Sequence, residues 1–156
     1  MTNERITVFR KQINTMSKCI FVDSDVLIDI FSKRMPFYTD SAYFLELVEN
    51  GVFQAFTTPL VIANVYYVLQ KFSSKDVALN SIRKIRTLLG IIDMNQRIVD
   101  RALNSSISDF EDALQIYSAE NAVMDLIVTR NIEHFLDSNL SVLSPTEAIS
   151  LLAPRP

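Results

Sequence analysis

Two aspartates follow a short apolar run near the start of the chain. Residues 19–22 are apolar, and Asp23 and Asp25 come directly after them. Hard cations such as Mg²⁺ and Mn²⁺ bind carboxylate oxygens, so two acids at one strand end could hold such an ion. The alternative is that Asp25 caps the next helix while Asp23 lies in a solvated turn. The residues alone leave both interpretations open.

Asn64 is a short polar residue within the apolar stretch of residues 59–69. A helix that is apolar nearly all round is expected to be buried. A buried amide without hydrogen-bond partners costs about 1–3 kcal/mol. We therefore expect Asn64 either to bond other backbone groups or to face the acidic pocket and help to hold a metal ion or its waters.

Three acids stand close together at the start of a later predicted helix. Ser108 and Glu111 have the spacing of a capping box, and Asp109 and Asp112 lie beside them. Acids in a first helical turn complement the helix dipole, which accounts for Asp109 and Glu111. Asp112 shares a face with Asp109 and has apolar neighbours, so its side chain is predicted to face a pocket.

A second apolar run, at residues 126–128, leads into Thr129, Arg130 and Asn131. This strand end offers a hydroxyl, a cation and an amide. His134 follows and is the only histidine of the chain. A lone histidine is more often a surface or packing residue than a catalyst, and no serine or cysteine motif accompanies it for a nucleophilic triad.

Alternating strands and helices must position these side chains. Strands are predicted at residues 19–22, 52–56, 91–92, 125–129 and 140–143. Helices are predicted at residues 26–32, 40–49, 59–71, 74–89, 96–103, 108–121 and 145–152. This order predicts an α/β fold with a parallel sheet that is covered on both faces. Ligands bind such sheets beyond the carboxyl ends of the strands, where Asp23 and Asn131 are expected to lie.

The composition limits the class of protein. A chain of 156 residues, 49% hydrophobic, suits one globular domain, and we expect residues 1–17 to be an N-terminal extension of a domain at 18–156, with Met16 as an alternative start. A single cysteine excludes an internal disulfide and favours the reducing cytoplasm. No apolar run reaches the about 20 residues of a membrane span. The net charge of -3 disfavours wrapping of nucleic acid by overall charge.

These segments, in this order, resemble the motifs of PIN domains. Val-Asp-Ser-Asp-Val-Leu-Ile-Asp at 22–29 resembles the opening Asp-Thr-Asn-Val-Leu-Leu-Asp motif of the family. Asp-Phe-Glu-Asp-Ala-Leu at 109–114 resembles its third-acid helix, and Val-Thr-Arg-Asn at 128–131 resembles its last motif. The resemblance runs from about residue 19 to residue 152. It is strongest to the toxin subunits of bacterial VapBC-type toxin–antitoxin pairs.

The resemblance implies a PIN-like three-layer sandwich with a central parallel sheet of four to five short strands. It also implies an endoribonuclease that depends on Mg²⁺ or Mn²⁺, forms a homodimer and is silenced by an antitoxin. Asp23 takes the first acid position of the family and Asp112 the third. Asn64 stands where many members have Glu, and Asn131 where many have Asp, whereas Asp25 replaces the usual Asn.

By this resemblance, metal-assisted hydrolysis of RNA would use Asp23 and Asp112 as metal ligands, with help from Asp25 or Asp109. Asn64 and Asn131 would complete the catalytic site. The substrate contacts would come from Arg34, Thr129 and Arg130. A basic helix could add phosphate contacts, although a solvated helix face explains its residues at least as well. These basic residues are Lys75, Arg83, Lys84 and Arg86.

Two alternatives remain open at this point. The two Asn positions favour a PIN-like module that has lost catalysis and binds RNA or protein. The Asp23 and Asp25 pair also suits a phosphatase of the haloacid-dehalogenase type, in which the first acid is the nucleophile. That mechanism needs a later Lys and a further acidic pair, which the sequence does not supply in a convincing arrangement.

Overall fold

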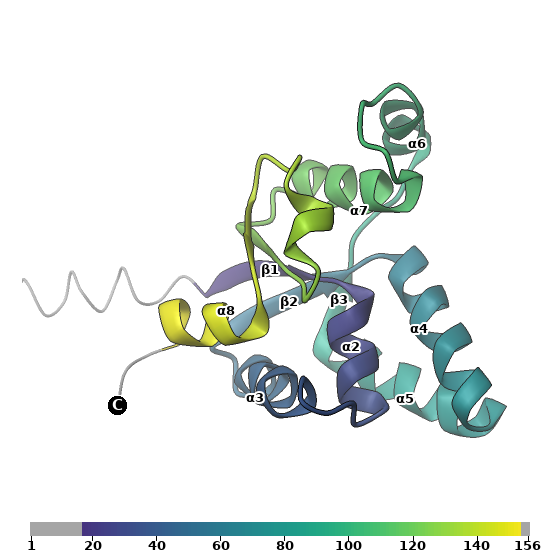
Figure 1. Cartoon of the computed structure of the whole chain (residues 1–156), viewed down its shortest axis with the longest axis vertical. Coiled ribbons are helices and arrows are strands. Elements are labelled where there is room, and N and C mark those ends of the chain that lie inside the picture. The colour runs from purple at the N-terminus through teal and green to yellow at the C-terminus, as the bar shows by residue number, and fades with distance from the viewer. Residues whose placement is uncertain (1–16, 154–156) are drawn as a thin grey trace, which may run out of the picture.

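The computed structural model describes residues 17–153, which build a parallel β-sheet between layers of helices (Figure 1). The strands are β1 (Lys18–Val22), β2 (Phe53–Thr57), β3 (Leu89–Ile91), β4 (Leu126–Val128) and β5 (Ser141–Leu143). Their order in the sheet is β3-β2-β1-β4-β5, and neighbouring strands run parallel. The predicted α/β class with a central parallel sheet of short strands is therefore confirmed.

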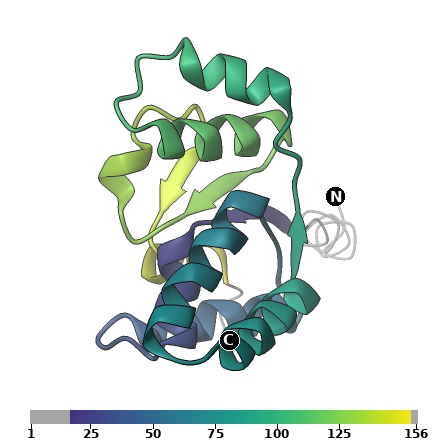
Figure 2. The same cartoon turned by 90° about the vertical axis from the view of Figure 1, so that its right-hand side faces the viewer.

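Helices cover both faces of the sheet. They are α2 (Ser24–Phe31), α3 (Tyr38–Glu49), α4 (Pro59–Phe72), α5 (Lys75–Leu88), α6 (Gln96–Leu103), α7 (Phe110–Asn121), η1 (Ile132–Phe135) and α8 (Pro145–Leu152). Helices α6 and α7 lie on one side of the sheet, and α2, α3, α4 and α5 lie on the other (Figures 1 and 2). This arrangement is the expected three-layer sandwich.

The central strand β1 explains why the site forms where it does. Ile20, Phe21 and Val22 are buried, as expected for a strand with helices on both of its faces. Val22 is in register with Val128 of β4, so the two strands end at the same level. The residue that follows each strand, Asp23 or Thr129, therefore emerges beside the other at the carboxyl edge of the sheet.

Local signals set several helix ends as predicted. The Thr58 side chain accepts a hydrogen bond from the amide of Val61, and Pro59 occupies the first turn of α4. Gly51 has a φ of 75° just after α3, a left-handed conformation that glycine adopts without strain. The predicted capping box at Ser108 is wrong. Asp109 is the N-cap of α7 instead, because its carboxylate accepts the amide of Asp112.

The remaining differences concern short elements. The third strand covers Leu89–Ile91 rather than residues 91–92, and it is positioned by packing: a Cβ on Gly90 would lie 2.5 Å from the Phe56 ring. The 3-10 helix η1 has no counterpart in the predicted elements. The expected N-terminal extension falls almost wholly outside the described residues. Within 17–153, no helix is long and apolar enough to span a membrane.

Candidate active site

Asp23 lies at the junction between β1 and α2 and caps the helix. Its Oδ1 accepts the backbone amide of Ser24 at 2.7 Å, and the side chain is only 5% exposed. Asp25 lies in the first turn of α2, where an acid is stabilised by the helix dipole. The capping role is thus taken by Asp23 rather than by Asp25. Because α2 begins at Ser24, Asp25 has helical backbone, and the two carboxylates are not related by the alternation of an extended strand.

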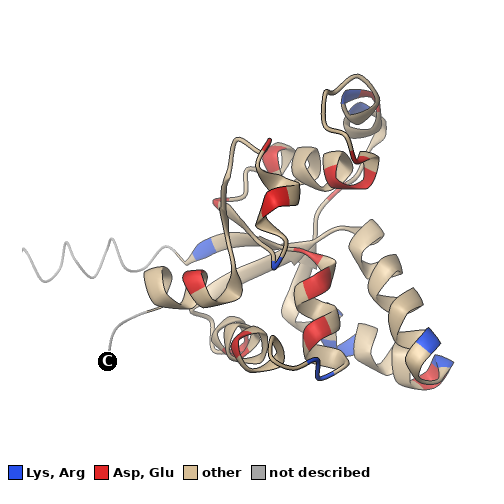
Figure 3. Ribbon diagram, viewed as in Figure 1, with Lys and Arg blue, Asp and Glu red and all other residues tan. Residues whose placement is uncertain are grey.

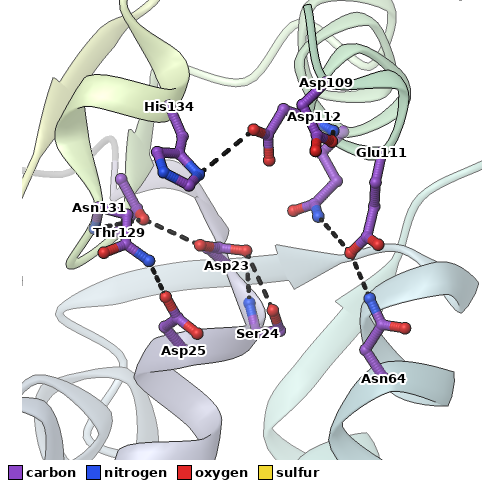
Figure 4. A network of polar contacts seen from close by, with 11 residues as sticks. Asp23, Ser24, Asp25, Asn64, Asp109, Glu111, Asp112, Thr129, Asn131 and His134 are labelled. Atoms are coloured by element: carbon purple, nitrogen blue, oxygen red, sulfur yellow. Dashed lines mark hydrogen bonds and ion pairs between the residues drawn. The ribbon is translucent and has the colours of Figure 1, made fainter.

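The segment after β4 orients both carboxylates (Figure 4). The hydroxyl of Thr129 donates to Asp23 Oδ2 at 2.9 Å, and Thr129 is fully buried. The side-chain amide of Asn131 donates to Asp25 Oδ2, while its backbone amide donates to Thr129 Oγ1 at 3.0 Å. Residues 106 positions apart in the sequence are thereby held in one network.

Arg130, between these two residues, forms a buried ion pair with the far part of α2. Its Nε donates to Asp29 Oδ2 at 2.8 Å, and its guanidinium lies 4.2 Å from the centre of the Phe37 ring. Asp29 is completely buried, and burial raises the pKa of its carboxyl while the bond to Arg130 opposes that rise. The sequence motif contains Asp29, but the spacing alone did not indicate Arg130 as its partner.

Asp112 approaches the site from α7, on the opposite side of the sheet. Its carboxylate is 16% exposed, and Oδ2 lies 3.3 Å from Nδ1 of His134 on η1. Asp109 precedes it as the N-cap of α7. In Figure 4 the Asp112 side chain extends from α7 towards His134, on the side of the helix that faces the end of β1. His134 is largely exposed, yet it faces this acid.

The electrostatics of the two anchoring acids are unusual. Burial raises the pKa of Asp23 to about 6, with the charge of Asp25 adding to the rise and the bonds from Thr129 and Ser24 opposing it. Burial also raises the pKa of Asp112 to about 6, with the charge of Asp109 adding to the rise. Asp112 contributes to the shift of Asp23, so the two carboxylates share one electrostatic environment.

Asn64 faces the site from α4, as one of its two predicted alternatives required. Its amide donates to Oε1 of Glu111 on α7 and so joins two helices across the site (Figure 4). Nε2 of the buried Gln115 lies 3.5 Å from the same oxygen. The sequence pattern predicts for Glu111 only a capping box with Ser108 and an interaction with the helix dipole. No spacing rule relates residues 64 and 111, so only the fold reveals this contact.

The chemistry of these donors fits a hydrated divalent cation. Asp23, Asp25 and Asp112 bring hard carboxylate oxygens towards one region. The backbone amide and hydroxyl of Ser24 both donate to Asp23 Oδ1, and Thr129 donates to Oδ2, so a lone pair remains on Oδ2. Among residues 17–153, no three acidic, His or Cys side chains are close enough to enclose an ion. Mg²⁺ usually keeps several waters and needs only one or two carboxylates. We therefore regard Asp23 and Asp112 as the pair that fits such an ion.

Most of the basic residues that were expected to contact substrate lie away from the acidic site. Acids gather on α2, α7 and η1, where these elements face each other (Figure 3). Arg34 follows the carboxyl end of α2, so the length of that helix separates it from Asp23. Helix α5, which carries Lys75, Arg83, Lys84 and Arg86, lies across the sheet from α7 (Figures 1 and 2).

Known proteins resemble this chain in sequence and in fold. The family model described as PIN domain matches residues 19–133. Ribonuclease VapC1 from Aquifex aeolicus (strain VF5) is 30% identical in an alignment of 136 residues, which covers 84% of this chain and 93% of that protein.

Solved structures share the fold at lower identity. A toxin-antitoxin complex from Klebsiella pneumoniae has a TM-score of 0.61 and 21% identity, covering 81% of this chain and 97% of that one. VapBC2 from Rickettsia felis, bound to a DNA fragment from its promoter, has a TM-score of 0.60 and 17% identity, covering 81% and 98%. The family match covers most of the chain, and the matched range contains Asp23 and Asp112. The chain therefore belongs to the PIN domain family.

Proposed function

We propose that this protein is a metal-dependent endoribonuclease of the VapC toxin type, which hydrolyses RNA phosphodiester bonds. The observation that carries the proposal is the pair Asp23 and Asp112, two carboxylates from the end of β1 and from α7 whose pKa values burial raises to about 6. Acids with such shifts gather at functional sites. The 30% identity to Ribonuclease VapC1 over nearly the full length of that protein supports the same reaction class.

The proposed reaction assigns the site residues to two roles, metal binding and positioning of the metal-binding acids. Asp23 and Asp112 would hold the ion, and Asn131 and Thr129 keep Asp25 and Asp23 in place. A bound Mg²⁺ or Mn²⁺ would lower the pKa of a water and stabilise negative charge on the phosphate. Because Thr129 is buried, we assign it this orienting role rather than contact with RNA.

Substrate contacts are proposed for Arg130 and Arg34. The Nε of Arg130 is engaged by Asp29, and its side chain remains about one-quarter exposed (24%), so its guanidinium could still meet a phosphate. Arg34 lies further from the acids and would contact a more distant part of an RNA strand. Asp109, as the N-cap of α7, is proposed to support Asp112 rather than to bind the ion itself.

An antitoxin partner is proposed from the structural relatives. Two of them are described as a toxin-antitoxin complex and as VapBC2, and they share the fold with this chain. A homodimer is proposed because the resemblance to PIN domains implies one. Light scattering of the purified protein, alone and with the product of any small open reading frame found beside its gene, would test both.

The decisive test is RNA cleavage by the purified protein with Mn²⁺, Mg²⁺ or EDTA. We expect cleavage that requires metal and falls at least 100-fold in Asp23→Asn and in Asp112→Asn, as for loss of a central electrostatic group. Asp76→Asn serves as a control because Asp76 is a first-turn acid of α5, away from the site. Equal cleavage by all three variants would refute the assignment.

A second candidate is a PIN domain that binds RNA or protein without cutting it. Asn64 and Asn131 favour it, because each contributes an amide where a carboxylate would bind metal more strongly. This candidate predicts intact RNA in excess Mn²⁺ with folded wild-type protein. The match to the PIN family argues against the haloacid-dehalogenase alternative.

A further inference from the structure

Glu111 is held in an orientation that a purely solvated acid would not need. It lies in the first turn of α7, where a carboxylate can extend into water and still interact with the helix dipole. Instead, one of its oxygens accepts the side-chain amide of Asn64 on α4, and the amide of Gln115 lies 3.5 Å from the same oxygen. Two amides from two helices therefore fix this carboxylate beside the acidic site.

Gln115 supplies an independent observation. It is 2% exposed, and its Oε1 is buried without a hydrogen-bond partner. That oxygen belongs to the same side-chain amide whose Nε2 lies 3.5 Å from Glu111 Oε1, so the unpartnered acceptor lies in the group that contacts Glu111. A buried acceptor without a donor is costly. Neighbouring carboxylate and amide oxygens are the ligands that a hard cation, or a water bound to it, would satisfy.

The position of Glu111 relates it to the two anchoring acids. It precedes Asp112 in the chain, and its charge contributes to the electrostatic environment of Asp112. In Figure 4 its side chain extends from α7 towards Asn64, on the side of the site opposite Asn131. The carboxylates of Asp25 and Glu111 thus flank the pair formed by Asp23 and Asp112.

We propose that Glu111 is a third acidic residue of the metal site, which binds waters of a divalent cation held by Asp23 and Asp112. Asn64 and Gln115 act as positioning residues that aim this carboxylate. The inference rests on the proposed function, since it requires that the site binds a divalent cation. It assigns Asn64 a role that does not depend on direct contact with the metal.

The test is calorimetric titration of Mn²⁺ into full-length protein stripped with EDTA. We expect Glu111→Gln, which keeps the size but removes the charge, to weaken Mn²⁺ binding about 10-fold or more, as loss of an outer-shell partner does. Asp76→Asn removes a first-turn acid from α5 and should bind Mn²⁺ as the wild type does. The exchange variant Asn64→Glu/Glu111→Asn returns a carboxylate to the same contact and should recover most of the affinity.

Each outcome is decisive provided that circular dichroism shows a native fold. A folded Glu111→Gln protein with wild-type Mn²⁺ affinity overturns the role of Glu111 and leaves the proposed function standing. A loss that the exchange variant does not reduce assigns the effect to packing between α4 and α7, and equally overturns the inference. Absence of Mn²⁺ binding to the wild type overturns both the inference and the proposed function.

Discussion

At the scale of single residues, the Asp23 side chain both caps α2 and accepts a hydrogen bond from the segment after β4. One oxygen caps α2 through the Ser24 amide, and the other accepts the hydroxyl of Thr129. These donors favour the charged carboxylate, but burial and the nearby Asp25 outweigh them and raise the pKa to about 6. A buried carboxylate that is ionised at neutral pH destabilises the metal-free fold, and a bound cation would relieve this strain.

The raised pKa values predict how stability depends on pH. Because Asp23 and Asp112 bind protons more tightly in the folded state, their contribution is fully present below about pH 4. It is lost as the pH rises through about 6. In EDTA at pH 7.5, we expect Asp23→Asn to be more stable than the wild type by up to about 3 kcal/mol, since one pKa unit corresponds to about 1.4 kcal/mol. Urea unfolding measures this difference.

The same comparison at pH 4 is the internal control, because both carboxylates are then largely protonated and the difference should shrink. Asp76→Asn, a change at an exposed position of α5, is the matched control variant. A wild type that is more stable than Asp23→Asn at pH 7.5 without metal would contradict the prediction. Saturating Mn²⁺ should reverse the order, because only the wild type binds the ion tightly.

At the scale of elements, the site depends on how α2 is fastened to the end of β4. Three consecutive residues, Thr129, Arg130 and Asn131, bond to three acids of the β1–α2 unit. The central bond is the ion pair between Arg130 and Asp29, in which Asp29 is fully buried. Breaking a buried pair leaves an uncompensated charge, which is far more harmful than loss of an exposed pair.

We therefore expect Arg130→Met to destabilise the fold by about 3–5 kcal/mol, because Asp29 would remain buried without its cation. The double variant Arg130→Met/Asp29→Leu should lose less than the sum of the single changes, since no charge is left unpaired. Denaturant unfolding measures all three. Arg101→Met, in the more exposed pair with Glu120, should cost no more than about 1 kcal/mol. Additive effects of the Asp29 and Arg130 changes would refute the coupling.

At the scale of the whole molecule, the acidic residues of the site and the basic residues of α5 lie on different parts of the surface. The net charge is -3, and acids face one another across the site between α2, α7 and η1 (Figure 3). The basic residues of α5 lie on the other side of the sheet from α7 (Figures 1 and 2). RNA at the site would therefore meet negative charge, and we expect its binding to depend on divalent cations more than on α5.

This separation predicts the effect of neutralising α5. We expect Arg83→Gln/Lys84→Gln to leave the kcat/KM for a short oligoribonucleotide within about twofold of the wild type, because surface charges away from a site act weakly at physiological salt. Cleavage assays at about 0.15 M salt measure it. Arg130→Lys is the comparison near the site and should reduce the same rate. A large loss from the α5 change alone would place the RNA path over α5.

The sequence by itself determined the fold class and predicted Asp23 and Asp112 as the candidate acids of the site. Strand and helix patterns are local, and residues that follow parallel strands must meet at one edge of the sheet, so Asp23 and Asn131 could be placed together in advance. The low exposure of the Asp112 side chain, 16%, agrees with the apolar neighbours that it has on one helix face. The fold class could be predicted because it depends on period and order, which are properties of short segments.

Only the tertiary structure decided which side chains bond to one another. Asn64 and Glu111 are 47 positions apart, and Arg130 and Asp29 are 101 apart. No sequence periodicity relates such residues, because their contacts form only when separate helices and strands pack at particular distances and angles. The buried, unpartnered oxygen of Gln115 is likewise a product of packing. The acidic residues could therefore be predicted from the sequence. Their hydrogen-bond partners could not, because only the packing of α2, α4 and α7 around the end of the sheet brings those side chains together.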